Sequence, residues 1–204
     1  MNIFFLSKRP KQAARWHADI HVVKMVVETA QLLCNVHHRA REASSHCLPP
    51  YTARARIPYQ DSRSGHRQLG PMIWVSESLG NYRWAVALGL ALCREYERGR
   101  GRAEGRTDPH RTQAVLEWLQ RHEPHFKRTR RTAVQLRHLA MPDRFKCGDA
   151  VEAYRAYYRS KARTMPMRWK GAAPPWWPSA GRAPARAARL SEAQASRKRR
   201  RPAE

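Results

Sequence analysis

The sequence predicts an all-α fold: a single helical domain built around a long, buried helix near the N-terminus. The stretch from His17 to His38 repeats its polar residues every three or four positions, the period of a helix. A second stretch after Pro71 is apolar almost all round, as in a buried helix. Nothing in the remaining pattern demands a sheet, although the apolar run Asn2 to Leu6 could form one short strand.

In the long helix the polar side chains fall on one narrow stripe. Its members are His17, His21, Lys24, Glu28, Gln31, Asn35 and His38. Apolar residues cover most of the remaining circumference, whereas an ordinary surface helix has a narrow apolar stripe under a broad polar face. We therefore expect this helix to be largely buried, with its polar stripe facing a cleft.

Such a row of groups is typical of an active-site floor, because burying polar groups without partners is costly. Glu28 is the candidate general base, with a pKa that partial burial would raise. Lys24, His17 and His21 would hold a charged leaving group or a phosphate, and Gln31 completes the candidate catalytic set. The alternative is a half-exposed helix on which Lys24 and Glu28 form an i,i+4 ion pair, in the less favourable order.

The helical period is lost between Glu42 and Gly70, and a connection of this length is usually functional or mobile. Basic residues alternate there with tyrosines, a mixture that contacts phosphates and stacks bases. The candidate DNA-binding residues of this stretch are Arg54, Arg56, Arg63 and His66. A disordered surface loop is an equal interpretation of the same composition.

The second helical stretch opens at Pro71, is interrupted near Gly80 and ends by Gly99. We expect it to pack against the first helix. Asn81 lies near its start and is a further candidate contact to phosphate, although such a position more often belongs to a helix cap. A third helix should begin at Asp108 and Pro109 and run to about His122.

Asp149 is expected to cap a last helix, on which Arg155, Tyr158 and Lys161 form a second polar stripe. The aromatic segment that follows would lie over the domain, where its tryptophans could stack an extruded base or simply cover the core. Lys170 in this segment, with Arg155 and Lys161, completes the candidate phosphate contacts. The catalytic and DNA-binding domain would thus span residues 1–178, and residues 179–204 would form a disordered basic tail that binds polyanions.

Charge indicates the class of partner. The chain of 204 residues has 40 Lys and Arg against 16 Asp and Glu, a formal net charge of +24. Nucleic acid is the first candidate for so basic a protein. With no signal peptide and no long apolar span, we expect a soluble cytoplasmic protein that contacts no membrane.

No metal or cofactor is expected. His17, His21 and Glu28 share a face, but the zincin pattern needs Glu directly after the first His, and Ala18 stands there. Phosphate-binding glycine loops and G-x-S-x-G elbows are absent from the sequence. The cysteines form no C-x-x-C pair, and Cys34 and Cys93 lie in apolar helical settings typical of reduced core residues.

Several motifs resemble a small all-helical phage family over roughly Met1 to Trp177. They are NIFFLS, HxDIHVVKMVVETAQLL, WVSESLGNYRW, AMPDRFK, AVEAYRAYYRSK, and the closing RWK with PPWW. The family is identified with thymidine-hypermodification enzymes, the amino acid:DNA transferases or α-glutamyl/putrescinyl thymine pyrophosphorylases. The resemblance implies a transferase in the host cytoplasm that acts on double-stranded DNA carrying pyrophosphate-activated 5-hydroxymethyluracil. A free amino acid such as glycine would displace pyrophosphate from the exocyclic methylene of a flipped base.

The helical plan is also distantly similar to the phage pyrimidine-dimer DNA glycosylases, which use an N-terminal amine as nucleophile. This chain departs from them, because a residue as bulky as Asn2 normally leaves Met1 in place. Two alternatives therefore stay open: a glycosylase acting on a flipped, modified pyrimidine, and a non-catalytic basic DNA-binding protein.

Overall fold

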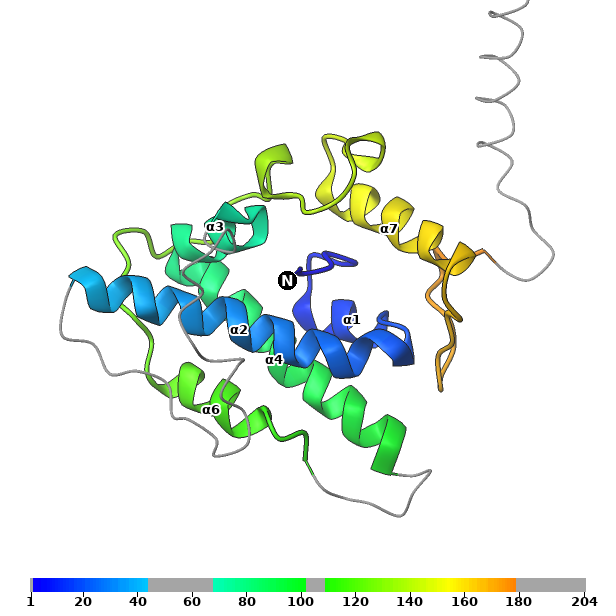
Figure 1. Ribbon diagram of the computed structural model, residues 1–204, viewed down its shortest axis with the longest axis horizontal. Helices are drawn as coiled ribbons and strands as arrows, with labels where there is room; N and C mark the ends of the chain where they lie inside the picture. Colours follow the sequence, from blue (N-terminus) through cyan, green and yellow to red (C-terminus); the bar gives the residue numbers. More distant parts are fainter. Residues whose placement is uncertain (1, 44–67, 102–108, 179–204) are drawn as a thin grey trace, which may run out of the picture. The chain divides into compact units, whose positions relative to one another are not determined.

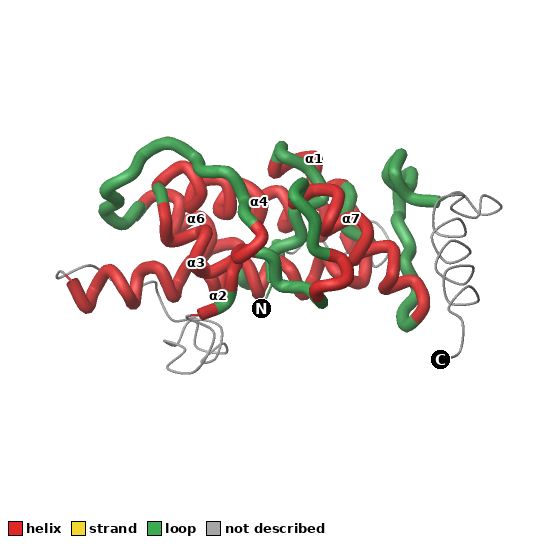
Figure 2. The backbone as a smooth tube through the Cα atoms, turned by 90° about the horizontal axis from the view of Figure 1, so that it is seen from above, coloured by secondary structure: helices red, strands yellow, loops and turns green. Residues whose placement is uncertain are grey.

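The computed structural model describes residues 2–43, 68–101 and 109–178. The described chain consists of helices and loops and contains no strand, which confirms the predicted all-α class (Figures 1 and 2). The longer helices are α1 (Pro10–Arg15), α2 (Asp19–Ala43), α3 (Gly70–Glu77), α4 (Leu79–Tyr96), α6 (Gln113–Arg121) and α7 (Ala150–Ser160). Single turns follow at Glu97–Gly101, Leu136–His138, Asp143–Phe145 and Lys161–Arg163.

The core lies where α2 crosses α4 (Figure 1). Leu32 and Leu33 of α2 and Leu88 and Leu92 of α4 are fully buried. Helices α1, α3 and α6 also pack on α4, so α4 is as central to the fold as the long N-terminal helix. The predicted packing of the second helical stretch against the first is therefore confirmed.

The N-terminal segment is extended and buried, but it is not a strand. Ile3, Phe4, Phe5 and Leu6 are at most 4% exposed. Phe4 contacts His21 of α2 and Tyr158 of α7, so the segment runs between these two helices (Figure 1). Its apolar run is explained by helices on both sides rather than by pairing with a second strand.

Two predicted helix boundaries shift and a third is confirmed. The break in the second stretch falls at Ser78, whose backbone is extended and whose hydroxyl accepts a hydrogen bond from the amide of Asn81. The third helix begins at Gln113, and Asp108 lies outside the described residues. Asp149 caps α7 as predicted, because its Oδ1 accepts bonds from the amides of Val151 and Glu152.

The chain divides into two units, Met1–Ala172 and Ala173–Glu204. The first part of the aromatic segment belongs to the larger unit: Asp19 N donates to Arg168 O, and Trp169 Nε1 donates to Trp16 O. In the second unit the rings of Trp176 and Trp177 lie edge to face. The proposed tail, residues 179–204, lies outside the described residues. None of the described helices is long and apolar enough to cross a membrane.

Candidate active site and polar network

The polar stripe does not line a cleft along its whole length. His17 precedes α2, and both His17 and His21 are buried. Lys24 is exposed, while Glu28 and Gln31 are half-buried. Asn35 is buried and His38 is half-buried, so the stripe is open to solvent in the middle of α2, around Glu28, and again at His38.

At this opening Glu28 has a different partner for each carboxylate oxygen. Oε2 accepts a hydrogen bond of 2.6 Å from the backbone nitrogen of Asn2. Oε1 lies 3.3 Å from Nζ of Lys24. The Glu28 side chain is 13% exposed and that of Lys24 is 71% exposed. The carboxylate is thus held in one orientation from inside the protein, while the exposed ammonium of Lys24 lies on its solvent side.

The side chain of Asn2 fixes the N-terminal segment at this position. Its Nδ2 donates to the carbonyl oxygen of Ala140 at 2.9 Å, and its Oδ1 accepts a bond of 3.1 Å from the buried hydroxyl of Tyr154. We call Asn2, Lys24, Glu28 and Tyr154 the Glu28 site. The sequence singles out Glu28 and Lys24 because they are neighbours on one helix, but it gives no signal for Asn2 and Tyr154, which tertiary folding brings in.

His17 and His21 belong to an aromatic cluster rather than to an anion site. Nδ1 of His17 donates to the carbonyl of Ala13, and Nδ1 of His21 lies 2.9 Å from the hydroxyl of Tyr158. Burial lowers the pKa of His17 to about 4. Burial, His17 and the nearby ammonium groups of Lys161 and Lys24 lower the pKa of His21 to about 3. With these lowered pKa values both imidazoles are neutral at neutral pH, so neither brings a positive charge to the predicted anion site.

The predicted phosphate contacts are scattered. The guanidinium of Arg155 donates to Leu6 O and to Glu152. The ammonium of Lys161 lies over the rings of Phe4 and Tyr157. Lys170 lines a pocket beside the start of α2, and of the predicted site residues only His17 shares that pocket. Arg54, Arg56, Arg63 and His66 lie outside the described residues.

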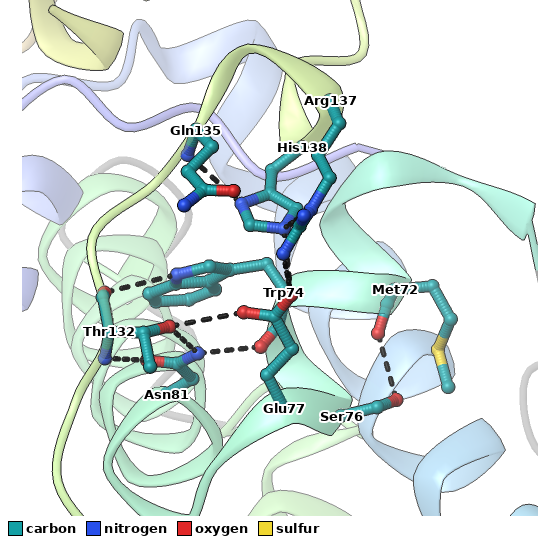
Figure 3. Close-up of polar contacts among 9 residues, drawn as sticks. All are labelled: Met72, Trp74, Ser76, Glu77, Asn81, Thr132, Gln135, Arg137 and His138. Atoms are coloured by element: carbon teal, nitrogen blue, oxygen red, sulfur yellow. Dashed lines mark hydrogen bonds and ion pairs between the residues drawn. The ribbon is translucent and has the colours of Figure 1, made fainter.

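Asn81 is buried and structural rather than a phosphate contact. Its Nδ2 donates to Trp74 O at 2.7 Å and to the Thr132 hydroxyl at 2.8 Å, and its Oδ1 accepts from Thr132 N at 2.9 Å (Figure 3). All of these partners lie inside the protein. The alternative interpretation of this position, a helix cap in an aromatic core, describes it correctly.

Asn81 belongs to a polar network that binds residues 128–138 to α3 and α4, and we call these residues the clamped segment. Glu77 is its centre: Oε1 accepts from Arg137 at 2.8 Å and lies 3.0 Å from Nε2 of His138, and Oε2 accepts from the Thr132 hydroxyl (Figure 3). Burial alone would raise the pKa of Glu77, but the bond from Arg137, with those from His138 and Thr132, lowers it. The carboxylate is therefore ionised and ties two distant parts of the chain together.

Two glycines let the clamped segment approach the helices. A Cβ at Gly80 would overlap the backbone nitrogen of Arg131, and a Cβ at Gly70 would lie 2.6 Å from the carbonyl oxygen of Arg137. The sequence marks Gly80 only as an interruption of the helix. The structure explains this glycine, because the backbone of Arg130 and Arg131, about fifty residues further along the chain, lies against it.

Metal binding, and chemistry at the two buried thiols, find little support among the described residues. In that part of the chain, no three His, Cys, Asp or Glu side chains lie close enough together to hold a metal ion. Cys34 and Cys93 are buried and unpaired, as predicted, and burial raises the pKa of both thiols, that of Cys93 to about 12. Neither is a ready nucleophile, because the thiolate is the reactive form.

Comparison with family models, with curated proteins and with solved structures finds no match to this chain.

Proposed function

We propose that this protein is a DNA base-modifying transferase whose reaction takes place at the Glu28 site. One observation carries the proposal: the Glu28 carboxylate is fixed by the Asn2 nitrogen on one oxygen, while the other oxygen lies beside the exposed ammonium of Lys24. A carboxylate with a set orientation and access to solvent suits a general base. The net charge of +24 supports DNA as the macromolecular substrate.

The reaction would join an amino acid to pyrophosphate-activated 5-hydroxymethyluracil in double-stranded DNA, inside an infected bacterial cell. The amine nitrogen attacks the exocyclic methylene carbon, a C–N bond forms, and the C–O bond to pyrophosphate breaks. Glu28 accepts the proton that the amine loses. Lys24 stands where a positive charge can stabilise the departing pyrophosphate. The neutral His17 and His21 support the position of α2 and take no charge in this scheme.

The decisive experiment is mass spectrometry of nucleosides from DNA that carries the activated base. The DNA is incubated with the protein and a mixture of amino acids and then digested. A new nucleoside heavier by an amino acid residue supports the transferase and identifies the amino acid. An unchanged nucleoside profile together with tight DNA binding contradicts it and leaves a non-catalytic DNA-binding protein.

Substitution of Glu28 tests the assigned role. Glu28→Gln keeps an oxygen that can accept the Asn2 bond but removes the base, so product formation should fall by about 10²-fold to 10⁴-fold while DNA binding survives. The matched control is Glu117→Gln, because Glu117 is also a half-buried helical glutamate with one amide partner. Equal losses in both variants, or loss of folding in Glu28→Gln alone, would make Glu28 a structural residue.

A glycosylase acting on a flipped, modified pyrimidine is the second candidate, with Glu28 as the base that activates its nucleophile. The Asn2 nitrogen, 2.6 Å from Glu28, is an amide with Met1 attached and is not that nucleophile. A free base or an abasic site in the same digest would support this reaction instead.

A further inference from the structure

The pocket that His17 and Lys170 share is lined by the end of α1, the start of α2, the end of α4 and the closing residues 169–172. Its volume is about 790 Å³, within the range of pockets that bind small organic molecules. No residue of the Glu28 site lines it. It is therefore a separate pocket, and all of its lining lies in the larger of the two units.

Hydrogen bonds attach one wall of this pocket to the start of α2. Asp19 N donates to Arg168 O at 2.8 Å, and Lys170 N donates to Oδ1 of Asp19 at 3.3 Å. Nε1 of the half-buried Trp169 donates to Trp16 O at 3.1 Å. Because this indole nitrogen is already satisfied, what Trp169 adds to the lining is apolar surface.

His17, another residue of the lining, has one ring nitrogen without a partner. Its Nδ1 lies 2.7 Å from the carbonyl oxygen of Ala13, which can only accept, so Nδ1 carries the hydrogen. Burial lowers the pKa of His17 to about 4, so the ring is neutral and Nε2 is a bare acceptor. In the described chain Nε2 is buried and has no hydrogen-bond partner. Such buried polar atoms are rare, and a molecule bound in the pocket can supply the donor that this one needs.

The charged groups of the lining differ in how they are paired. Arg98 and Arg15 lie 3.0 and 4.0 Å from the same oxygen of Glu95, so one carboxylate serves two guanidinium groups. The exposed ammonium of Lys170, by contrast, forms no ion pair with any described residue. The half-buried carboxylate of Asp19 accepts a bond only from the backbone nitrogen of Lys170 in this part of the chain. The pocket thus offers both a cation and a carboxylate that no side chain of opposite charge neutralises.

We propose that this pocket binds a free amino acid with a large apolar side chain. Its ammonium group donates to Nε2 of His17 beside Asp19, and its carboxylate pairs with Lys170. A zwitterion matches a lining that holds acceptors for one end and a cation for the other. The pocket volume and the surface of Trp169 accommodate the side chain. The proposal concerns binding alone: it does not depend on the reaction at Glu28 and holds even if that reaction fails.

The test uses L-phenylalanine and two analogues that each lack one charged group. The full-length protein, without DNA, is titrated with L-phenylalanine, phenethylamine and 3-phenylpropionate by isothermal titration calorimetry at pH 7.5. We expect L-phenylalanine to bind at least several-fold more tightly than either analogue, because each analogue leaves one end of the pocket unpaired. Equal affinities for the three compounds, or no binding of L-phenylalanine, would overturn the proposal.

Substitutions at two glycines locate the site. A Cβ at Gly171, in the lining, meets no atom within 4 Å, and the same holds at Gly148, which lies outside this pocket. Gly171→Phe should fill the pocket and abolish the binding of L-phenylalanine, whereas Gly148→Phe should bind it as the wild type does. If Gly171→Phe fails to fold, Ala172→Phe, at an exposed residue of the lining, replaces it. Unchanged binding by a folded blocking variant would contradict the assignment to this pocket.

Two further variants test which end of the ligand meets which residue. Lys170→Gln should weaken the binding of L-phenylalanine several-fold and leave that of phenethylamine unchanged, because phenethylamine has no carboxylate. His17→Phe keeps a ring in the aromatic cluster but removes the acceptor, so it should weaken both amines and spare 3-phenylpropionate. The control is Lys11→Gln, an exposed lysine of α1 outside the lining, which should change none of the three affinities. If a folded Lys170→Gln weakens all ligands equally, or none, the assigned orientation is wrong.

Discussion

His17 and His21 illustrate how the environment of a residue changes what its type suggests. In the sequence pattern, His17 and His21 lie in a row on one helix face and therefore suggest cationic ligands for an anion. In the structure Phe4 and Tyr158 surround them, and burial lowers their pKa values to about 4 and about 3. In the structure only His21 lies on α2, because His17 precedes the helix, and the packed aromatic segments decide whether either side chain carries charge.

This burial makes folding sensitive to mild acid. The unfolded histidines titrate near pH 6.5, whereas the folded ones stay neutral until about pH 4 and about pH 3. Between these values the unfolded state binds more protons, so stability is full above pH 6.5 and falls as the pH decreases. We expect a loss of about 1 kcal/mol per histidine for each pH unit below 6.5.

Urea unfolding at pH 7.5, 6.0 and 5.0 measures this loss. His17→Phe removes one of the two titrating groups and should give a visibly smaller decrease in stability between pH 6.0 and 5.0, even if it is less stable at pH 7.5. The control His125→Gln changes an exposed histidine and should follow the wild-type slope. A wild-type stability that does not change over this range would contradict the neutral, buried state of the two side chains.

The position of the clamped segment also depends on tertiary contacts and not on its own sequence pattern. It contains no long helix, and its sequence indicates only strong basicity. Its position follows from contacts with α3 and α4, such as that between Glu77 and His138, sixty-one residues apart. Local periodicity cannot reveal such a contact, because both partners lie on segments whose relative positions are set by the fold.

Gly80 is the sharpest test of this attachment. Within a helix, Gly→Ala normally stabilises by up to about 1 kcal/mol. At Gly80 the new Cβ would overlap the backbone of Arg131, and such crowding costs about 1–3 kcal/mol. We therefore expect Gly80→Ala to destabilise the protein in urea unfolding, despite the better helix former. Gly148→Ala, where the Cβ meets nothing, should stay within about 0.5 kcal/mol of wild type; a stabilised Gly80→Ala would show that the segment does not lie on α4.

For the whole molecule, helical periodicity was sufficient to predict an all-α fold and the packing of its two apolar helices. It did not predict the conformation of Asn2 to Leu6, because a buried apolar run has the same pattern whether helices or strands cover it. The candidate site was predicted in part: Glu28 and Lys24 are neighbours on one helix and appear together in the pattern. Asn2 reaches Glu28 from 26 residues away, and Tyr154 contacts Asn2 across 152 residues, so no local spacing could indicate them.

The distribution of charge over the molecule leads to a final prediction. Residues 179–204 carry eight basic and two acidic residues, so most of the excess positive charge resides elsewhere in the chain. Affinity for DNA falls with salt according to the number of phosphates neutralised. Replacing the eight basic residues of this region by Gln should therefore reduce the slope of log affinity against log salt without abolishing binding. Fluorescence anisotropy from 50 to 300 mM salt measures both the affinity and this slope. If binding disappears with these eight charges, the rest of the chain provides no DNA-binding surface, and the protein binds DNA through residues 179–204 alone.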